Sequence, residues 1–164
     1  MHTPEYWIAH LQLKPHSEGG FYKETYRSQE NIPARGLPGR FDDSRSFSTA
    51  IYFLLRSQDR SRFHRIKSDE LWHYHAGSTL SIFVLHNPGL SVFKLGPNPD
   101  QGESLQVVIP AGVWFGAKII QPDSYTLSSC TVAPGFDFRD FELADRTQLT
   151  HQFPEYRDVI EMLA

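Results

Sequence analysis

Short apolar or alternating runs follow one another along most of the chain, and turns rich in Gly and Pro separate them. Period-two alternation with β-branched and aromatic residues is typical of strands, whereas Asn87-Pro88-Gly89 and the Gly96 to Asp100 segment are turn signals. The runs expected to form strands are residues 21–26, 48–55, 80–85, 90–95, 105–109, 125–132 and 136–141. Many short strands at this spacing predict an all-β sandwich or barrel.

Segments at the two ends of the chain depart from this pattern. Thr3, Pro4 and Glu5 match an N-cap, a first-turn proline and an acidic residue suited to the helix dipole, so a short helix is expected to follow. Residues 155–163 predict a second helix packed on the outside.

The polar stretch 28–45 carries Gly and Pro and predicts a long loop. This loop is either a lid over the mouth of a barrel or a surface loop without a function.

Length and composition limit the class of protein. With 164 residues, 40% of them hydrophobic, the chain can fill one core and is too short for two ordinary domains, so we expect a single domain over residues 1–164. The net charge of −3 with scattered Lys and Arg gives no basic stripe for nucleic acid. No apolar run approaches the roughly 20 residues of a membrane helix, and the first residues do not resemble a signal peptide. We therefore expect a cytoplasmic protein without nucleic-acid or membrane partners.

Several isolated polar residues favour structural interpretations. Cys130 is the only cysteine and lies in an apolar run, which indicates a buried inert thiol rather than a nucleophile. The sequence Glu18-Gly19-Gly20 indicates a turn that needs positive φ, with a close backbone approach to a ligand as the alternative. The histidines expected to be solvated, because they lie in termini, turns or helix faces, are His2, His10, His16, His86 and His151.

Most of the candidate catalytic or metal-binding residues lie in two short motifs. The positions that match the two metal-binding motifs of cupins are His64, Glu70, Gly77, Pro110 and Gly112. Arg62 stands where the first histidine ligand of that pattern belongs, and Phe115 stands where the last one belongs. A guanidinium stays protonated and a phenyl ring has no lone pair, so neither residue can replace a metal ligand.

Strand parity predicts which of these side chains meet, because alternate residues of a strand face opposite sides of a sheet. If Glu70 points inward, then His73 and His75 point outward unless a bulge intervenes. The inner set expected from parity and from the second motif is Arg62, His64, Glu70, Trp72, Tyr74 and Phe115.

Three interpretations of this inner set stay open. In the acid–base interpretation His64 is the base, Glu70 fixes its tautomer or pairs with Arg62, and the Tyr74 hydroxyl is a third catalytic group. Arg62, Trp72 and Phe115 then bind the ligand, and no metal or cofactor is needed. In the metal interpretation a bulge adds His73 or His75 to the ligand set. In the structural interpretation the polar groups satisfy one another inside the barrel.

The chain resembles the cupin superfamily, and within it the cupin 5 group of single-domain cupins of unknown function. Beyond the two motifs, the fragments that carry the resemblance begin at Leu13, Thr49, Phe63, Asp69, Val108, Cys130 and Phe141 and span almost the whole length. The resemblance implies a cupin jelly-roll β-barrel with short flanking helices, a ligand-sized cavity, and a homodimer paired near residues 21–26.

Some cupins are deoxysugar-nucleotide epimerases that use a barrel histidine and a tyrosine without metal, and the pattern of Arg62, His64 and Tyr74 is similar in kind. We therefore expect a small-molecule-binding cupin, in its enzymatic version a metal-independent epimerase or isomerase of a polar or anionic carbohydrate-like metabolite. The alternatives are a non-catalytic ligand-binding protein and a metal-dependent cupin oxygenase.

Overall fold

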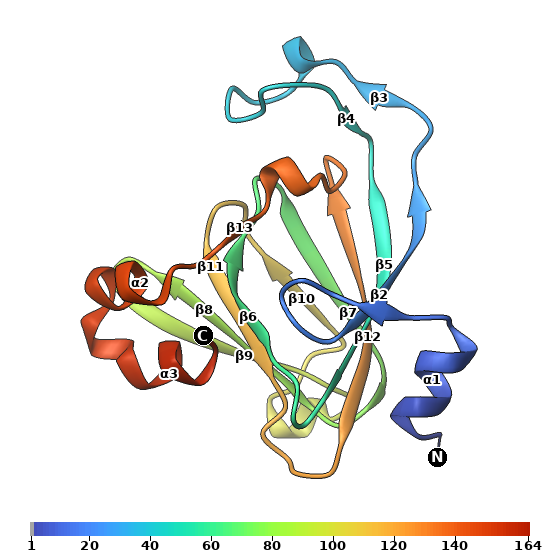
Figure 1. Ribbon diagram of the computed structural model, residues 1–164, viewed down its shortest axis with the longest axis vertical. Coiled ribbons are helices and arrows are strands. Elements are labelled where there is room, and N and C mark those ends of the chain that lie inside the picture. Colours follow the sequence, from blue (N-terminus) through green and yellow to red (C-terminus); the bar gives the residue numbers. More distant parts are fainter. Residues whose placement is uncertain (1) are drawn as a thin grey trace.

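Two antiparallel β-sheets packed face to face form the body of the protein (Figure 1). The computed structural model describes residues 2–164. The larger sheet contains, in spatial order, β1 (Lys14–Pro15), β2 (Phe21–Arg27), β5 (Thr49–Arg56), β12 (Tyr125–Ala133), β7 (Asp69–Gly77) and β10 (Gln106–Ile109). The smaller sheet contains β13 (Glu142–Leu143), β6 (Ser61–Arg65), β11 (Trp114–Lys118), β8 (Leu80–His86) and β9 (Gly89–Leu95).

The chain crosses repeatedly between the two sheets. From β5 to β8, and again from β9 to β12, each strand lies in the sheet opposite to that of the strand before it. This crossing is the connectivity of a double-sheet jelly roll. As a result, inward side chains of strands far apart in the sequence meet in one interior.

The core lies between the sheets and follows the period-two pattern of the strands. In β10, for example, Val107 and Ile109 are buried while Gln106 and Val108 are exposed. The largest inward side chains are Phe53, Trp72 and Phe115. Burial of one such side chain contributes roughly 1.5–3 kcal/mol, so the sheets are held together mainly by this apolar layer.

Three short helices cover the outside. The first, α1 (Pro4–His10), begins where the Thr3 hydroxyl accepts a hydrogen bond from the backbone N–H of Tyr6, as the sequence predicted. The helices α2 (Arg146–Gln152) and α3 (Arg157–Met162) lie over the smaller sheet, where Leu149 and Ile160 are buried. The predicted C-terminal helix is therefore present, and α2 was not predicted.

The prediction of a strand over residues 136–141 is wrong. That segment contains the 3-10 helix η3 (Phe138–Asp140), because the Asp137 carboxylate caps it by accepting from the backbone N–H of Arg139. Gly135 also packs so closely on Ser46 that a Cβ there would lie 2.1 Å from the serine Oγ. Pairing resumes only at β13, which joins β6.

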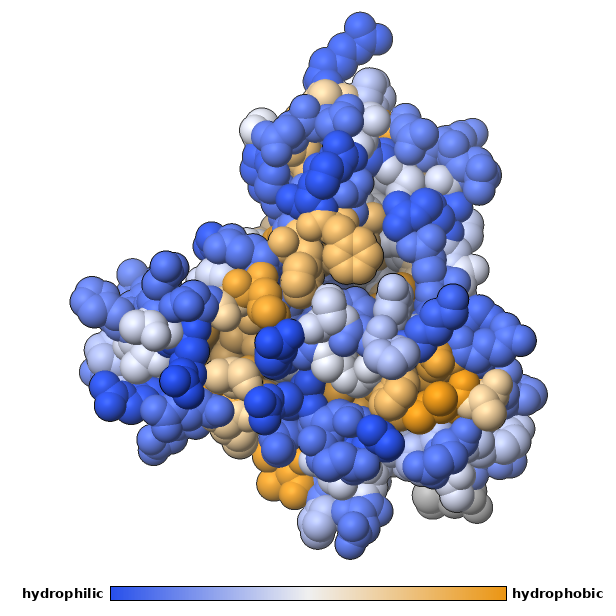
Figure 2. All heavy atoms as spheres, viewed as in Figure 1, coloured by the Kyte–Doolittle hydropathy of each residue, from blue (hydrophilic) through white to orange (hydrophobic). Residues whose placement is uncertain are grey.

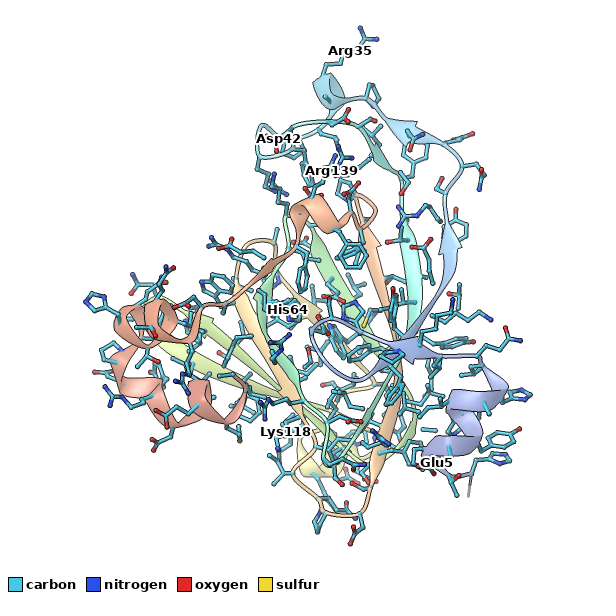
Figure 3. The ribbon with its side chains drawn as sticks, viewed as in Figure 1. Glu5, Arg35, Asp42, His64, Lys118 and Arg139 are labelled. Carbon is cyan, nitrogen blue, oxygen red and sulfur yellow. The ribbon has the colours of Figure 1, made fainter. Side chains whose placement is uncertain are left out.

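The loop predicted at residues 28–45 forms an arm that projects from the body at the top of Figure 1 and contains the short strands β3 (Asn31–Ile32) and β4 (Arg45–Ser46). Two hydrogen bonds of 2.6 Å join the Arg45 guanidinium to the Asp140 carboxylate, and both side chains are buried. At the surface Arg139 also reaches Asp43 at 3.0 Å. Figure 3 shows this junction, where Asp42 and Arg139 lie close together. The arm is thus tied to η3.

Figure 2 shows polar side chains over most of one face and an apolar strip across its middle, just below the arm. Phe138 is the exposed aromatic residue of η3, which lies in this region. Across residues 2–164, every helix is too short or too polar to pass through a bilayer.

Candidate functional site

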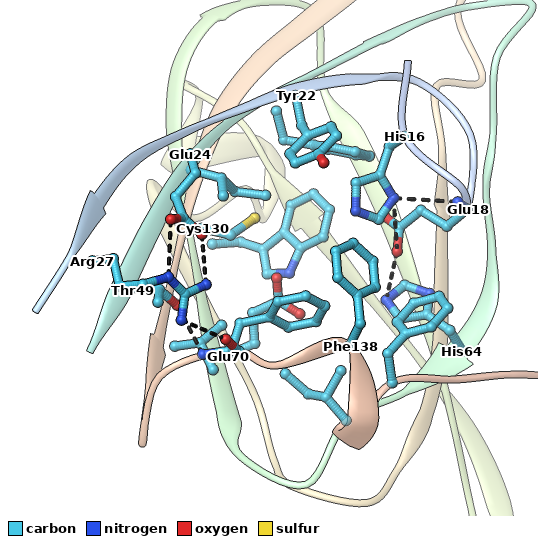
Figure 4. A pocket seen from close by; sticks show the side chains of 17 residues that line it. His16, Glu18, Tyr22, Glu24, Arg27, Thr49, His64, Glu70, Cys130 and Phe138 are labelled. Carbon is cyan, nitrogen blue, oxygen red and sulfur yellow. Dashed lines mark hydrogen bonds and ion pairs between the residues drawn. The ribbon is translucent and has the colours of Figure 1, made fainter. Parts of the chain in front are cut away.

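A cavity of about 310 Å³ lies between the two sheets and is bordered by η3 (Figure 4). Its walls come mainly from the larger sheet, with β6 and the turn that contains Glu18 on the opposite side. The lining residues are His16, Glu18, Tyr22, Glu24, Arg27, Thr49, Ile51, Phe53, His64, Ile66, Glu70, Trp72, Cys130, Val132, Phe136, Phe138 and Phe141. Six aromatic rings among them make the cavity largely apolar, so its few polar groups fix where a ligand can be recognised.

On one side of the cavity Glu18 lies between two histidines. Its Oε2 is 3.0 Å from Nε2 of His64 and 3.8 Å from Nδ1 of His16. Nδ1 of His64 lies 2.7 Å from the carbonyl oxygen of Arg62, which can only accept, so Nδ1 carries the proton. Nε2 of a neutral His64 is then an acceptor that faces the Glu18 carboxyl.

This geometry places one proton between Glu18 and His64. Burial lowers the pKa of His64, although the nearby Glu70 acts in the opposite direction. Burial likewise raises the pKa of Glu18, against the opposing effects of His16 and of the Ser61 hydroxyl, which donates to Oε1 at 2.8 Å. Both shifts favour the uncharged forms, so we infer that Glu18 donates its proton to Nε2 of His64.

Glu70 is the second buried carboxyl of the cavity. Burial raises its pKa to about 7, and the neighbouring Glu18 acts in the same direction, whereas His64 lowers it. The Cys130 thiol is close to Glu70, and burial raises its pKa well above its usual range. Cys130 is therefore a protonated thiol, whereas Glu70 can give or take a proton near neutral pH.

Glu24 and Arg27 form a second polar group, closer to the surface. Nε and Nη2 of Arg27 donate to the two carboxylate oxygens of Glu24 at 3.0 and 2.7 Å, and Nη1 donates to the carbonyl of Phe136 at 3.0 Å. Both side chains are about two-fifths exposed. Arg27 is therefore the guanidinium of this cavity, and it lies at the exposed end.

The structure places three of the six predicted site residues, His64, Glu70 and Trp72, in the lining of this cavity. His73 and His75 lie outside it, as parity predicted, and their Nε2 atoms pair with Thr131 and Ser129 of the neighbouring strand at 3.1 and 2.9 Å.

The inward position predicted for Arg62 is wrong. Its Nη2 donates to the carbonyl of Ser17 at 2.6 Å, and the side chain lies in a different surface depression, beside Arg60 and Arg146. The reason is a register shift, since β11 pairs Phe115 with His64 but Ala117 with Ser61. This bulge adds a residue to β6 and breaks the alternation that was assumed between positions 62 and 64.

Tyr74 and Phe115 also lie outside the lining. The Tyr74 hydroxyl donates to the carbonyl of Gly77 at 2.6 Å, so it satisfies a backbone acceptor at the end of its own strand, β7. Phe115 is buried, and its ring centroid lies 4.2 Å from that of His64. It therefore supports the imidazole rather than contacting a ligand.

His16 and Glu18 are the site residues that sequence reasoning missed, and the prediction that His16 is solvated is wrong, since its side chain is only 7% exposed. The signal lay in the adjacent glycines. Gly19 has φ of +116°, and a Cβ there would lie 2.0 Å from the carbonyl oxygen of Arg60. The predicted positive-φ turn is thus present, and its close packing on the start of β6 brings Glu18 to Ser61 and His64.

The donor set does not fit the metal that the cupin motifs would hold. Two of the four motif positions carry no ligand atom, and both ring nitrogens of His64 are engaged by Arg62 and Glu18. Within residues 2–164, no three His, Cys, Asp or Glu side chains are grouped so that they could hold an ion. The chemistry considered below therefore uses only the side chains of the protein.

Comparison with known proteins agrees with this architecture. The family profile Cupin_5, described as cupin superfamily (DUF985), matches residues 5–144. The uncharacterized protein YML079W of Saccharomyces cerevisiae is 34% identical over 143 residues, which cover 81% of this chain and 71% of the yeast protein.

Solved structures show the same fold. A hypothetical protein from Leishmania major is 37% identical, with a TM-score of 0.89 over 99% of both chains. Protein SO0799 from Shewanella oneidensis is 38% identical, also with a TM-score of 0.89, over 100% of this chain and 98% of that one. Oxalate decarboxylase from Bacillus subtilis is only 12% identical, with a TM-score of 0.54 over 92% of this chain and 36% of that one, and shares the fold alone. The predicted all-β cupin jelly roll is confirmed.

Proposed function

The chain belongs to the Cupin_5 family of the cupin superfamily, and from this premise we propose that it is a metal-independent isomerase or epimerase of a small polar, carbohydrate-like metabolite. The observation that carries the proposal is the pair of buried acid–base centres in one cavity. Glu18 and His64, 3.0 Å apart, form the first centre, and Glu70 with its pKa of about 7 is the second.

These centres have the properties that proton transfer at carbon needs. Glu18 takes a proton from the carbon beside a substrate carbonyl while its own proton passes to Nε2 of His64. The electron pair of the broken C–H bond forms the C=C bond of an enediol, and Glu70 gives its proton to the carbonyl oxygen. The Glu70 carboxylate then stabilises the His64 imidazolium, since its charge raises the pKa of His64.

The reverse transfers complete the reaction. Glu18 returns a proton to carbon while His64 gives its Nε2 proton back to Glu18. Return to the same carbon, after the enediol has turned its other face toward Glu18, gives the epimer, and return to the neighbouring carbon gives the isomer. In both cases the enediol hydroxyl that becomes the carbonyl gives its proton to the Glu70 carboxylate, so both centres end as they began. An anionic group on the substrate would bind at the exposed end of the cavity beside Arg27, since Arg62 lies outside the cavity.

A non-catalytic ligand-binding protein is the second candidate, and the aromatic lining supports it. Tyr22, Phe53 and Trp72 provide flat apolar surfaces suited to binding a sugar ring or another planar group. Such a protein would use the buried carboxyls only as hydrogen-bonding groups.

The experiment is hydrogen exchange in D₂O, followed by ¹H NMR over a panel of aldoses, ketoses, their phosphates and nucleoside diphosphate sugars. We expect one class to exchange the hydrogen beside its carbonyl. Loss of one acid–base group costs about 10²–10⁴-fold in rate, so His64→Gln and Glu18→Gln should slow exchange at least 100-fold. The matched control His75→Gln changes a histidine outside the cavity and should keep the wild-type rate.

Binding measurements separate the two candidates. Titration of the same panel should show that His64→Ala weakens ligand binding, because the Glu18 carboxyl in the cavity wall loses the partner that positions it, while His75→Ala changes little. A compound that binds in this way without exchange in the wild type would establish the binding protein instead. Equal losses in both histidine variants would mean that the ligand binds on another face.

A further inference from the structure

The indole N–H of Trp72 is a buried donor without a partner. Trp72 is 1% exposed, and among residues 2–164 its Nε1 is one of two buried side-chain polar atoms that make no hydrogen bond, the other being the hydroxyl of Ser46. Buried donors are nearly always paired, because an unpaired one costs about 1–3 kcal/mol. Such a group in a cavity wall points to a partner that the protein itself does not supply.

The surroundings of Trp72 fix the position of this donor. The indole meets the rings of Phe53 and Phe115 edge to face, with centroid distances of 5.4 and 6.5 Å. Because Glu70 lies two residues earlier on β7, its side chain faces the same side of the sheet, and both residues line the cavity. The nearest acceptor in the protein is the Glu70 carboxyl. The indole N–H interacts with it closely enough to lower the pKa of Glu70, but the contact does not reach the distance and angle of a full hydrogen bond, so this acceptor leaves the donor unsatisfied.

We propose that the Trp72 indole N–H and the protonated Glu70 carboxyl both donate hydrogen bonds to the carbonyl oxygen of the substrate, which makes Trp72 a further catalytic residue. This inference rests on the proposed isomerase function and names the group by which its substrate is recognised. The indole can only donate, so its partner must accept, and a carbonyl oxygen has two lone pairs for the two donors. Negative charge grows on this oxygen as the C–H bond breaks, so both hydrogen bonds strengthen in the transition state.

The proposal distinguishes a ketone from the corresponding alcohol. The probes are two ketoses, dihydroxyacetone and L-erythrulose, and the matched polyols glycerol and erythritol, which have the same carbon skeletons without the carbonyl. The readout is the indole ¹H–¹⁵N spectrum of the wild-type protein, which has three tryptophans. Spectra of Trp7→Phe and Trp114→Phe assign the Trp72 signal by elimination, so the test needs no variant of Trp72.

We expect ketoses to shift the Trp72 signal downfield in a saturable way, and polyols to bind at least tenfold more weakly. Trp7 is the internal control, since its N–H already donates to the Tyr125 hydroxyl at 3.1 Å and should not move. No shift of the Trp72 signal with either ketose, an equal shift with the polyols, or a bound water that stays on this N–H at saturating ketose would overturn the proposal.

Exchange rates separate this inference from the function on which it rests. Loss of one donor to a developing oxyanion costs about 10²–10³-fold, so Trp72→Phe should slow exchange of the substrate hydrogen by about 100-fold. Unchanged exchange in a folded Trp72→Phe would overturn the role of the indole and leave the isomerase proposal in place. A ketose-specific shift in a protein that catalyses no exchange would refute the isomerase and keep the carbonyl site.

Discussion

Replacement of Glu70 by glutamine tests the energetic consequence of burying this carboxyl. Burial raises its pKa from 4.5 to about 7. One pH unit corresponds to about 1.36 kcal/mol, so ionisation of Glu70 costs the folded protein about 3 kcal/mol relative to the unfolded chain. Between these two pKa values the folded state binds more protons than the unfolded state, and stability therefore falls as the pH rises. The loss begins above the unfolded value of 4.5 and is nearly complete above pH 7.

Glutamine has almost the same shape and no charge, so Glu70→Gln should lack this part of the pH dependence. Urea unfolding at pH 5, 6, 7 and 8, at one protein concentration, gives the free energy of unfolding by linear extrapolation. Between pH 5 and pH 8 the wild type should lose about 2–3 kcal/mol more than Glu70→Gln. Glu155→Gln, which changes an exposed glutamate, should follow the wild type. Parallel curves for the wild type and Glu70→Gln would refute the raised pKa.

Three further predictions concern assembly, metal content and the arm. The edge of β2 is exposed over most of its length, and β1 covers only its first two residues, so we expect two copies of the chain to pair along this edge. Light scattering at micromolar concentration should then give twice the 18.8 kDa chain mass, and a monomer mass would contradict the pairing. Elemental analysis of the isolated protein should find far less than one transition metal per chain, and one metal per chain that is lost in His64→Ala would revive the oxygenase alternative. Arg45→Met leaves the buried Asp140 with only Lys67, whose Nζ lies 3.7 Å from its Oδ1, and should lower the free energy of unfolding by about 3 kcal/mol. Arg139→Met, at a side chain that is 57% exposed, should lower it by at most about 1 kcal/mol. Equal losses measured by urea unfolding would mean that the Arg45 pair does not anchor the arm.

The fold could be predicted because strands and motifs leave local signals. Alternation and turn residues placed six of the seven expected strands within one position of their observed bounds, although β11 was not predicted, and the spacing of His64, Glu70 and Gly77 indicated the cupin arrangement. The strand predicted at residues 136–141 is absent because the apolar residues of this segment point to the cavity and to the surface from a turn. A short apolar run in the sequence does not distinguish such a turn from a strand.

The site could be predicted only where parity held. Trp72 and Glu70 face the cavity together because β7 is regular at that point, whereas the bulge in β6 separates Arg62 from His64. Bulges depend on how two strands pair across the sheet, which the sequence of one strand does not contain. Glu18 was missed for a related reason, since its contact with His64 joins a turn to a strand more than forty residues away.

The buried ion pair between Arg45 and Asp140 has a kinetic consequence. It ties η3, which borders the cavity, to the arm. The two segments therefore cannot move apart without separating two buried charges. Phe138, on the same turn, is 57% exposed, and its ring is held only by edge contacts with Phe136 and Phe141, at centroid distances of 5.0 and 6.3 Å. Rotamer changes of exposed side chains take picoseconds to nanoseconds, whereas loop opening takes far longer. We therefore expect a ligand to enter between the Phe138 ring and the exposed end of the cavity at Arg27 while the arm stays in place, and its residence time to be set by the contacts inside rather than by the motion of a lid.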